Sequence, residues 1–158
     1  MIPKTIPGKF SDRELLFGAA IAQLCMRNWP VLIRERAESQ NTLFQISSGG
    51  GKALVLFKYS TAAKSPWHFT VTKAQYGMLA EPDLACPQER RYMALICYLE
   101  GVCLLSSDEF LTIASPSEDA NLTVSRPHGG QFRVGGPGRK ELDSAIPRSR
   151  WTKEILMR

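Results

Sequence analysis

A lysine near the end of an apolar strand is the first residue of this sequence that could do chemistry. The stretch KALVLFKYS, residues 52–60, places five apolar residues in a row before Lys58. Successive side chains of a strand point to opposite faces, so both faces of this strand need cover, and Lys58 shares a face with Leu54 and Leu56. Burial in an apolar pocket lowers the pKa of a lysine, which is how catalytic lysines arise. A lysine at a strand end can instead lay its stem along the sheet and keep its ammonium in water.

The second group of candidate residues is a concentration of positive charge in the last third of the chain. From residue 121 to the end, eight cations stand against three carboxylates, so this part carries the whole net charge of +5. Such asymmetry favours an anionic partner, most often nucleic acid, although a basic rim can also serve an acidic protein partner or solubility alone. Lysine and arginine bind phosphates, and exposed aromatic side chains stack on bases. The residues that we expect to bind nucleic acid are Arg126, His128, Arg133, Arg139 and Lys140, together with Lys58 and Lys64.

Other chemistry-bearing patterns are incomplete. The glycines of GGPGRK and SSGGGK are not followed by the G-K-[ST] of a phosphate-binding loop. There is no G-x-S-x-G motif, His68 falls on the polar side of an alternating strand, and His128 lies in a glycine-containing turn, so each histidine is interpreted as a surface residue. The cysteines contain no C-x-x-C pair, which predicts reduced thiols that pack as small apolar residues, with no zinc site. They are Cys25, Cys86, Cys97 and Cys103.

The elements that position these residues begin with a helix over 12–28. Ser11 and Glu14 have the spacing of a capping box, and Pro30 forbids continuation. One apolar stripe of this helix is Leu15, Ala19, Ala22 and Met26, which we expect to face the core. Strands over 31–36, 41–46 and 52–60 then predict an antiparallel meander.

The middle of the chain alternates short elements. Residues 65–72 alternate apolar and polar side chains, which predicts a strand with one wet face, and residues 73–81 predict a short helix. Residues 91–99 are apolar on both faces, which predicts a central strand, followed by a two-residue turn at Glu100 and Gly101 into residues 102–105. Ser106 and Glu109 form a second capping box, which begins a short helix.

The last third predicts a β-hairpin between residues 122 and 134, then a flexible basic connection over about 135–150, and finally an apolar anchor from Trp151 to Met157. The fold class predicted is α+β, or mixed α/β. We expect one domain over 1–158, with a central mixed sheet of about five or six strands, an amphipathic N-terminal helix and the C-terminal hairpin. The start of the chain has no apolar targeting segment, and no apolar run could span a bilayer, which predicts a cytoplasmic protein without a membrane partner.

The order of elements over residues 11–99, together with the lysine on the third strand, resembles the core of the PD-(D/E)XK restriction-endonuclease-like family. In that family an acidic residue two positions before the lysine and another near the second strand hold Mg²⁺ beside the scissile phosphate. Here the triplet is Leu56-Phe57-Lys58, and near the second strand only Glu38 is acidic, with Asn41 closer to its start. Since Mg²⁺ needs oxygen ligands, the resemblance implies a degenerate member that binds nucleic acid or protein without cutting.

These observations predict a non-enzymatic module that binds DNA, RNA or a nucleoprotein assembly through the basic hairpin and tail, without a cofactor. One alternative is a Mg²⁺-dependent nuclease, in which Lys58 and Glu38 would be the catalytic candidates. Carboxylates from outside the family motif, at Glu14 or Glu35, would then have to reach Lys58. The other alternative is a protein-interaction or inhibitor subunit.

Overall fold

The computed structural model describes residues 8–27, 30–36, 42–49, 51–81 and 89–156. Their fold is α+β and contains two sheets, of five strands in the order β1-β2-β3-β5-β6 and of three strands in the order β4-β7-β8. The strands are β1 Leu32–Glu35, β2 Leu43–Ser48, β3 Gly51–Ser60, β4 Trp67–Val71, β5 Arg90–Cys97, β6 Val102–Ser106, β7 Ala120–Ser125 and β8 Arg133–Gly135. The helices are α1 Asp12–Cys25, α2 Lys73–Ala80, α3 Ser107–Ile113 and α4 Arg150–Ile155, with 3₁₀ turns η1 Tyr98–Glu100, η2 Pro127–Gly129 and η3 Pro137–Arg139.

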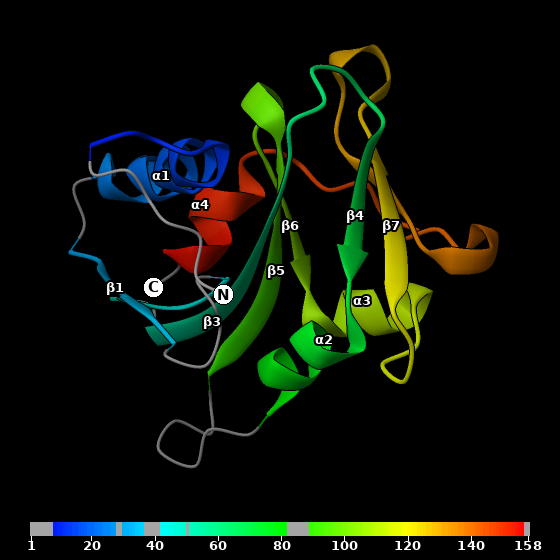
Figure 1. The fold of residues 1–158 in the computed structure, drawn as a ribbon, viewed down its shortest axis with the longest axis horizontal. Helices are drawn as coiled ribbons and strands as arrows, with labels where there is room; N and C mark the ends of the chain where they lie inside the picture. Colours follow the sequence, from blue (N-terminus) through cyan, green and yellow to red (C-terminus); the bar gives the residue numbers. More distant parts are fainter. Residues whose placement is uncertain (1–7, 28–29, 37–41, 50, 82–88, 157–158) are drawn as a thin grey trace.

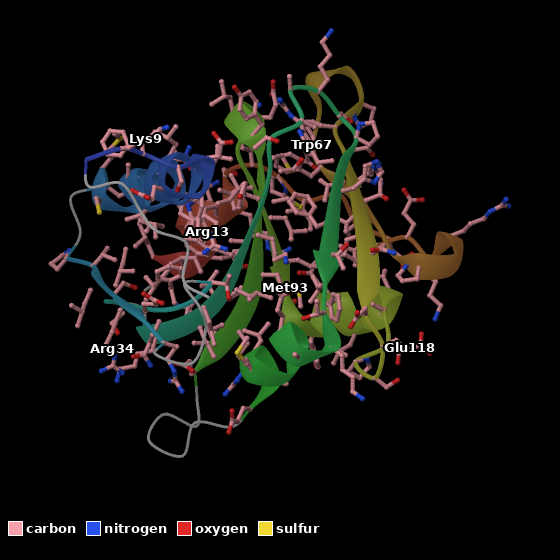
Figure 2. The ribbon with its side chains drawn as sticks, viewed as in Figure 1. Lys9, Arg13, Arg34, Trp67, Met93 and Glu118 are labelled. Atoms are coloured by element: carbon pink, nitrogen blue, oxygen red, sulfur yellow. The ribbon has the colours of Figure 1, made fainter. Side chains whose placement is uncertain are left out.

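The five-stranded sheet has an apolar layer on each face. Helices α1 and α4 cover one face, and the three-stranded sheet with α2 and α3 covers the other (Figure 1). Strand β3 therefore sends Val55 and Phe57 into one layer and Leu54 and Leu56 into the other, and all four are buried. Figure 2 shows Trp67 and Met93 in the layer between the two sheets. The prediction that β3 needs cover on both faces is confirmed.

The central pair of strands, β3 and β5, is parallel, whereas the other neighbours in the large sheet are antiparallel. Parallel neighbours require a crossover, and here β4 and α2 provide it. The predicted meander over β1, β2 and β3 and the predicted central strand β5 are confirmed. Strand β4 buries alternate residues, as its pattern predicted, but it leaves the large sheet and pairs with β7.

The first helix begins as predicted but buries a different face. The Ser11 side chain accepts a hydrogen bond from the Glu14 backbone N–H at 3.1 Å, and the helix runs over Asp12–Cys25. Its buried residues are Leu16, Phe17, Ala20 and Leu24. The stripe expected in the core is wrong: Leu15 and Met26 are 55% and 76% exposed. The helix has apolar residues on both sides. The side that is buried carries Phe17, whose ring contacts Phe57 and Tyr59 of β3.

The remaining predicted elements are present with shifted bounds. The capping box at Ser106 and Glu109 starts α3, and the hairpin of β7 and β8 is antiparallel. The connection from β5 to β6 is longer than the predicted two residues, because η1 precedes Gly101. Gly101 has a φ of 116°, which favours glycine.

The stretch from residue 135 to 150 contains buried anchors. Leu142 is 8% and Ile146 is 1% exposed, and isolated bridges join Phe132 to Ile146 and Gly135 to Glu141. The chain then enters α4, where Trp151 and Ile155 are fully buried, as expected for a C-terminal anchor. The Trp151 indole N–H donates to the Ala20 carbonyl at 2.9 Å, which ties α4 to α1.

Two of the cysteines pack as expected. Cys97 and Cys103 are buried, whereas Cys25 is exposed and Cys86 lies outside the described residues. Burial raises the pKa of the Cys97 thiol to about 12, with a further contribution from the charge of Glu100, and burial also raises the pKa of Cys103. Within the described ranges, no helix has the length and apolar character needed to cross a bilayer.

Candidate nucleic-acid interface

Lys58 lies near the end of β3 and is half-buried, with its side chain held by α2. Its Nζ donates to the Gln75 side-chain Oε1 at 3.1 Å. The same oxygen accepts the Thr72 backbone N–H at 3.0 Å, because Thr72 and Gln75 form the capping box of α2. An amide oxygen that already completes a helix cap therefore also binds the lysine.

The electrostatic environment of Lys58 disfavours its charged form. Burial lowers the pKa of Lys58, and the positive charge of Arg13 in α1 lowers it further. Among the described residues, Lys58 makes no ion pair with a carboxylate. A partly desolvated lysine with an amide partner has the properties of a base, but it lacks the oxygen ligands that would place a metal ion beside it.

The acidic positions that a nuclease would need are occupied differently. Leu56 is fully buried in the layer between the sheets. The Glu14 carboxylate accepts the Ser11 hydroxyl at 3.2 Å, Glu35 lies on β1, and Glu38 and Asn41 lie outside the described residues. Across the parts of the chain that the structure describes, no group of three or more His, Cys, Asp or Glu side chains could bind a metal ion.

Arg126 belongs to the fold more than to a free surface. Its guanidinium forms a 2.5 Å ion pair with Glu100 of η1 and donates to the carbonyls of Gly129 and Gly130. Its backbone N–H donates to the Ser65 hydroxyl at 2.9 Å. These contacts fasten the hairpin to η1 and to the loop before β4, and the role of Arg126 in binding stays a prediction.

Three further cations, one on β8 and two after it, face solvent. Arg133 is on β8, and Arg139 and Lys140 follow at η3; we name residues 133–140 the β8–η3 margin. All three side chains are exposed, and none forms an ion pair within the described chain. Glu141 borders the margin opposite Gly135. The margin therefore presents three positive charges that form no ion pair in the described chain, with one carboxylate at its border.

The outer face of the three-stranded sheet adjoins the β8–η3 margin. Its outward residues are polar: Thr70 donates to Asn121 at 2.9 Å, and His68 Nδ1 lies 3.3 Å from the Thr123 hydroxyl. The inward residues of the same strands, including Trp67 and Phe69, are buried, and so is Phe132 just before β8. Strands β4, β7 and β8 contain no carboxylate.

The remaining predicted binding residues are dispersed. Lys64 is exposed in the loop before β4, and that loop contacts Arg126 through Ser65. His128 is in η2, but its side chain lies outside the described part of the chain. Lys58 is on the other sheet, beneath α2. The structure thus brings Arg133, Arg139 and Lys140 to one margin and separates Lys58 from it.

Sequence reasoning missed the partners that decide what each cation can do. Gln75 could have been found from the T-x-x-Q spacing of its capping box. Glu100 could not, because it lies 26 residues from Arg126 and no local pattern joins them. The same holds for Arg150, which pairs with Glu109 of α3 at 2.8 Å and is 41 residues away from it.

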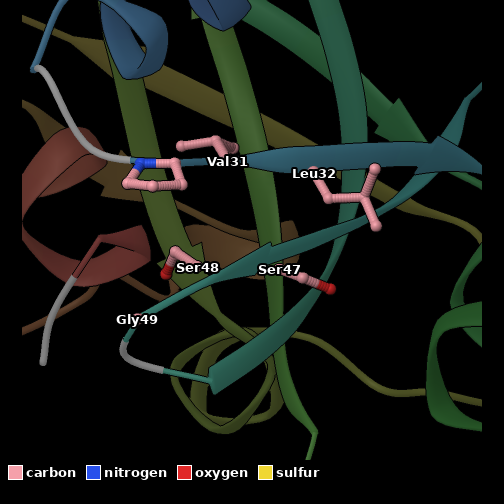
Figure 3. A pocket seen from close by; sticks show the side chains of 6 residues that line it. Val31, Leu32, Ser47, Ser48 and Gly49 are labelled. Atoms are coloured by element: carbon pink, nitrogen blue, oxygen red, sulfur yellow. The ribbon is translucent and has the colours of Figure 1, made fainter.

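A groove beside the edge strand β1 offers little chemistry. It has a volume of about 440 Å³ and lies between β1 and the β2 end of the β2–β3 hairpin (Figure 3). None of its lining side chains is ionisable, and Ser47 and Ser48 supply only hydroxyls. The lining residues are Pro30, Val31, Leu32, Ser47, Ser48 and Gly49.

Comparison of the chain with protein-family models, with curated proteins and with solved structures found no match.

Proposed function

We propose that this protein is a non-enzymatic module that binds nucleic acid through the β8–η3 margin and the adjoining outer face of the three-stranded sheet. The observation that carries the proposal is the exposure of Arg133, Arg139 and Lys140, which form no ion pair within the described chain and lie beside strands that contain no carboxylate. A surface with this charge attracts phosphates, because bringing phosphates to lysine and arginine releases counterions from the nucleic acid.

The contacts expected are to the backbone of the nucleic acid. Hydroxyl, amide and imidazole groups on the outer face can donate to phosphate or sugar oxygens, as Thr70, Asn121, Thr123 and His68 are exposed there. The aromatic residues of these strands are buried and cannot stack on bases. The proposed binding is therefore sensitive to salt and tolerant of sequence.

The test reverses charge at the margin and at a matched set of cations elsewhere. The margin variant is Arg133→Glu, Arg139→Glu and Lys140→Glu. The control variant is Lys9→Glu, Lys52→Glu and Lys153→Glu, which changes net charge equally at exposed residues outside the hairpin. Fluorescence anisotropy with single-stranded and duplex DNA and RNA then measures affinity at fixed salt.

The margin variant should bind at least about 30-fold more weakly than the wild type, since each lost phosphate contact costs on the order of 1 kcal/mol and each reversed charge adds repulsion. The control should lose clearly less. Equal losses in both variants, or no binding by the wild type to any of the four nucleic acids, would overturn the proposal. Mg²⁺-dependent cleavage that disappears in Lys58→Ala would favour the nuclease alternative instead.

A further inference from the structure

A second surface of interest is a groove between the end of α1 and the start of α4. It has a volume of about 580 Å³, and every lining side chain except Met26 is polar. Among the residues that the structure describes, no carboxylate lines it. The lining residues are Gln23, Met26, Arg27, Arg148, Ser149 and Thr152. These side chains supply two guanidinium groups, two hydroxyls and one amide, so the groove is rich in hydrogen-bond donors.

The stem of the Arg148 side chain packs against the backbone at Gly101. A Cβ atom placed on Gly101 would lie 2.7 Å from Arg148 Cγ and 2.9 Å from its Cδ. The stem of Arg148 therefore crosses Gly101 at a distance that only glycine permits.

Arg27 is positioned from the other side of the groove. It follows α1 and donates from Nη2 to the Thr152 hydroxyl of α4 at 3.3 Å. Thr152 is 7% exposed, so this contact places the guanidinium against a buried hydroxyl. The remaining guanidinium donors of Arg27 have no acceptor among the described residues.

The two groove arginines differ from the two arginines that the fold neutralises. Arg126 pairs with Glu100, and Arg150 pairs with Glu109 and Glu154. Arg27 and Arg148 form no ion pair within the described residues. The carboxyl end of α1 contributes about half an elementary negative charge near Arg27, which is smaller than the two full positive charges of the groove.

We infer that this groove binds a phosphate ester of about the size of a nucleotide. Two arginines can bind a phosphate through paired N–H donors. The Ser149 hydroxyl and the Gln23 amide can donate to its remaining oxygens, whereas the Thr152 hydroxyl already donates to the Ser149 carbonyl. The volume is within the range of small-molecule sites, about 300–1,000 Å³, which leaves room for the group that the phosphate esterifies. Met26, 76% exposed, offers an adaptable apolar surface for that group.

This site is separate from the proposed nucleic-acid surface, because α1 and α4 lie on the opposite face of the large sheet from β7 and β8. The phosphate could belong to a free nucleotide or to the end of a nucleic-acid strand. The two sources share the same recognition chemistry and differ in what extends beyond the groove.

The test is calorimetric titration of the full chain, in buffer free of phosphate and sulfate, with adenosine monophosphate, adenosine and inorganic phosphate. Adenosine monophosphate should bind, and adenosine should not. The variants Arg27→Gln and Arg148→Gln should each lose about tenfold in affinity or more, as expected for removal of a charge-assisted contact. Lys153→Gln, which removes an exposed charge of α4 outside the groove, should bind as the wild type.

A second arm separates the two sources and the two proposals. The comparison is between oligonucleotides with a 5′-phosphate and with a 5′-hydroxyl. If the phosphorylated form binds more tightly and Arg148→Gln abolishes the difference, the groove binds strand ends. If the two forms bind equally, the source of the phosphate is a free nucleotide. The triple margin variant should bind adenosine monophosphate normally, whatever happens to its strand binding. No binding of adenosine monophosphate or of the 5′-phosphate, or unchanged affinity in both arginine variants, would overturn the inference.

Discussion

Arg150 of α4 and the cations of the β8–η3 margin carry the same charge in the sequence but have opposite environments in the structure. Arg150 of α4 is paired with Glu109 and Glu154, and its helix buries Trp151 and Ile155. Arg133, Arg139 and Lys140 of the margin are exposed and have no such partners in the described chain. A count of charges therefore does not locate positive potential, because distant carboxylates neutralise some cations and leave others available to a ligand.

The largest effect is expected from removing the main side chain of α4. Trp151 is fully buried, its ring contacts Phe57, and its N–H donates to the Ala20 carbonyl. Trp151→Ala should lower the free energy of unfolding by about 3–5 kcal/mol, from lost burial and a residual cavity. Urea denaturation followed by circular dichroism measures this. Leu99→Ala, at a residue that is 76% exposed, is the control and should change little. A decrease in the free energy of unfolding below about 1 kcal/mol in Trp151→Ala would show that α4 is not part of the core.

A smaller effect is expected at the α3–α4 ion pair. Burial alone would raise the pKa of Glu109, but hydrogen bonds from Arg150 and Ser106 outweigh it and hold that pKa below its usual value. The stabilisation is complete above the unfolded carboxyl pKa of about 4.3 and is lost as the pH falls through the lower folded pKa. Glu109→Gln should cost about 1–2 kcal/mol at pH 7.

The pH dependence provides the check on that pair. Between pH 6 and pH 3 the wild type should lose more stability than Glu109→Gln, since the variant has no proton to bind at this position. Thermal unfolding across this range compares the two proteins. Parallel stability curves would show that the pair contributes no pH-dependent stability.

Within the hairpin, Arg126 and Arg133 provide a direct comparison. Arg126→Gln should lower the free energy of unfolding by about 1 kcal/mol, because it removes the contacts to Glu100 and to two glycine carbonyls. Arg133→Gln should change stability by less than about 0.5 kcal/mol but should weaken nucleic-acid binding. If the two substitutions had the opposite effects, with stability lost at Arg133 and binding lost at Arg126, the division of roles would be reversed.

Lys58 differs from the ion-paired and the exposed cations, because its Nζ donates to the amide oxygen of Gln75. Since burial and then Arg13 lower its pKa, the folded state bears a cost for the charged ammonium at neutral pH, and this cost disappears as the pH rises toward the usual lysine value of about 10.4. Because Lys58 is only half-buried, solvent screens much of this cost, and Lys58→Met should stabilise the fold by no more than a few tenths of a kcal/mol at pH 7. Chemical denaturation at pH 7 measures it. A loss above about 1 kcal/mol would instead make Lys58 a required charge partner.

Local patterns predicted most of the elements, and long-range packing decided the rest. The capping boxes at Ser11 and Ser106, the alternation of β4 and the apolar run of β5 each placed an element correctly. The buried face of α1 was predicted wrongly, although its larger apolar side chains, Phe17 and Leu24, lie on the face that packs against the large sheet and α4. The transfer of β4 into a second sheet depends on its pairing with β7, about fifty residues later.

The candidate site was less predictable than the fold for the same reason. Arg133, Arg139 and Lys140 were identified by charge, and their exposure agrees with that expectation. The pairing of Arg126 with Glu100 and the placement of Arg148 across Gly101 arise from segments that meet only in the folded chain. Residue type alone therefore identified the cations but could not distinguish a structural arginine from a free one.

The salt dependence of binding to single-stranded DNA tests most directly whether the β8–η3 margin binds nucleic acid. Three phosphate contacts predict that the logarithm of the association constant falls with the logarithm of salt concentration with a slope of about −2, at roughly 0.7 per contact. In the Arg133→Glu, Arg139→Glu, Lys140→Glu variant the slope should approach zero. A wild-type slope near zero, or an equal slope in wild type and variant, would contradict phosphate binding by these three residues.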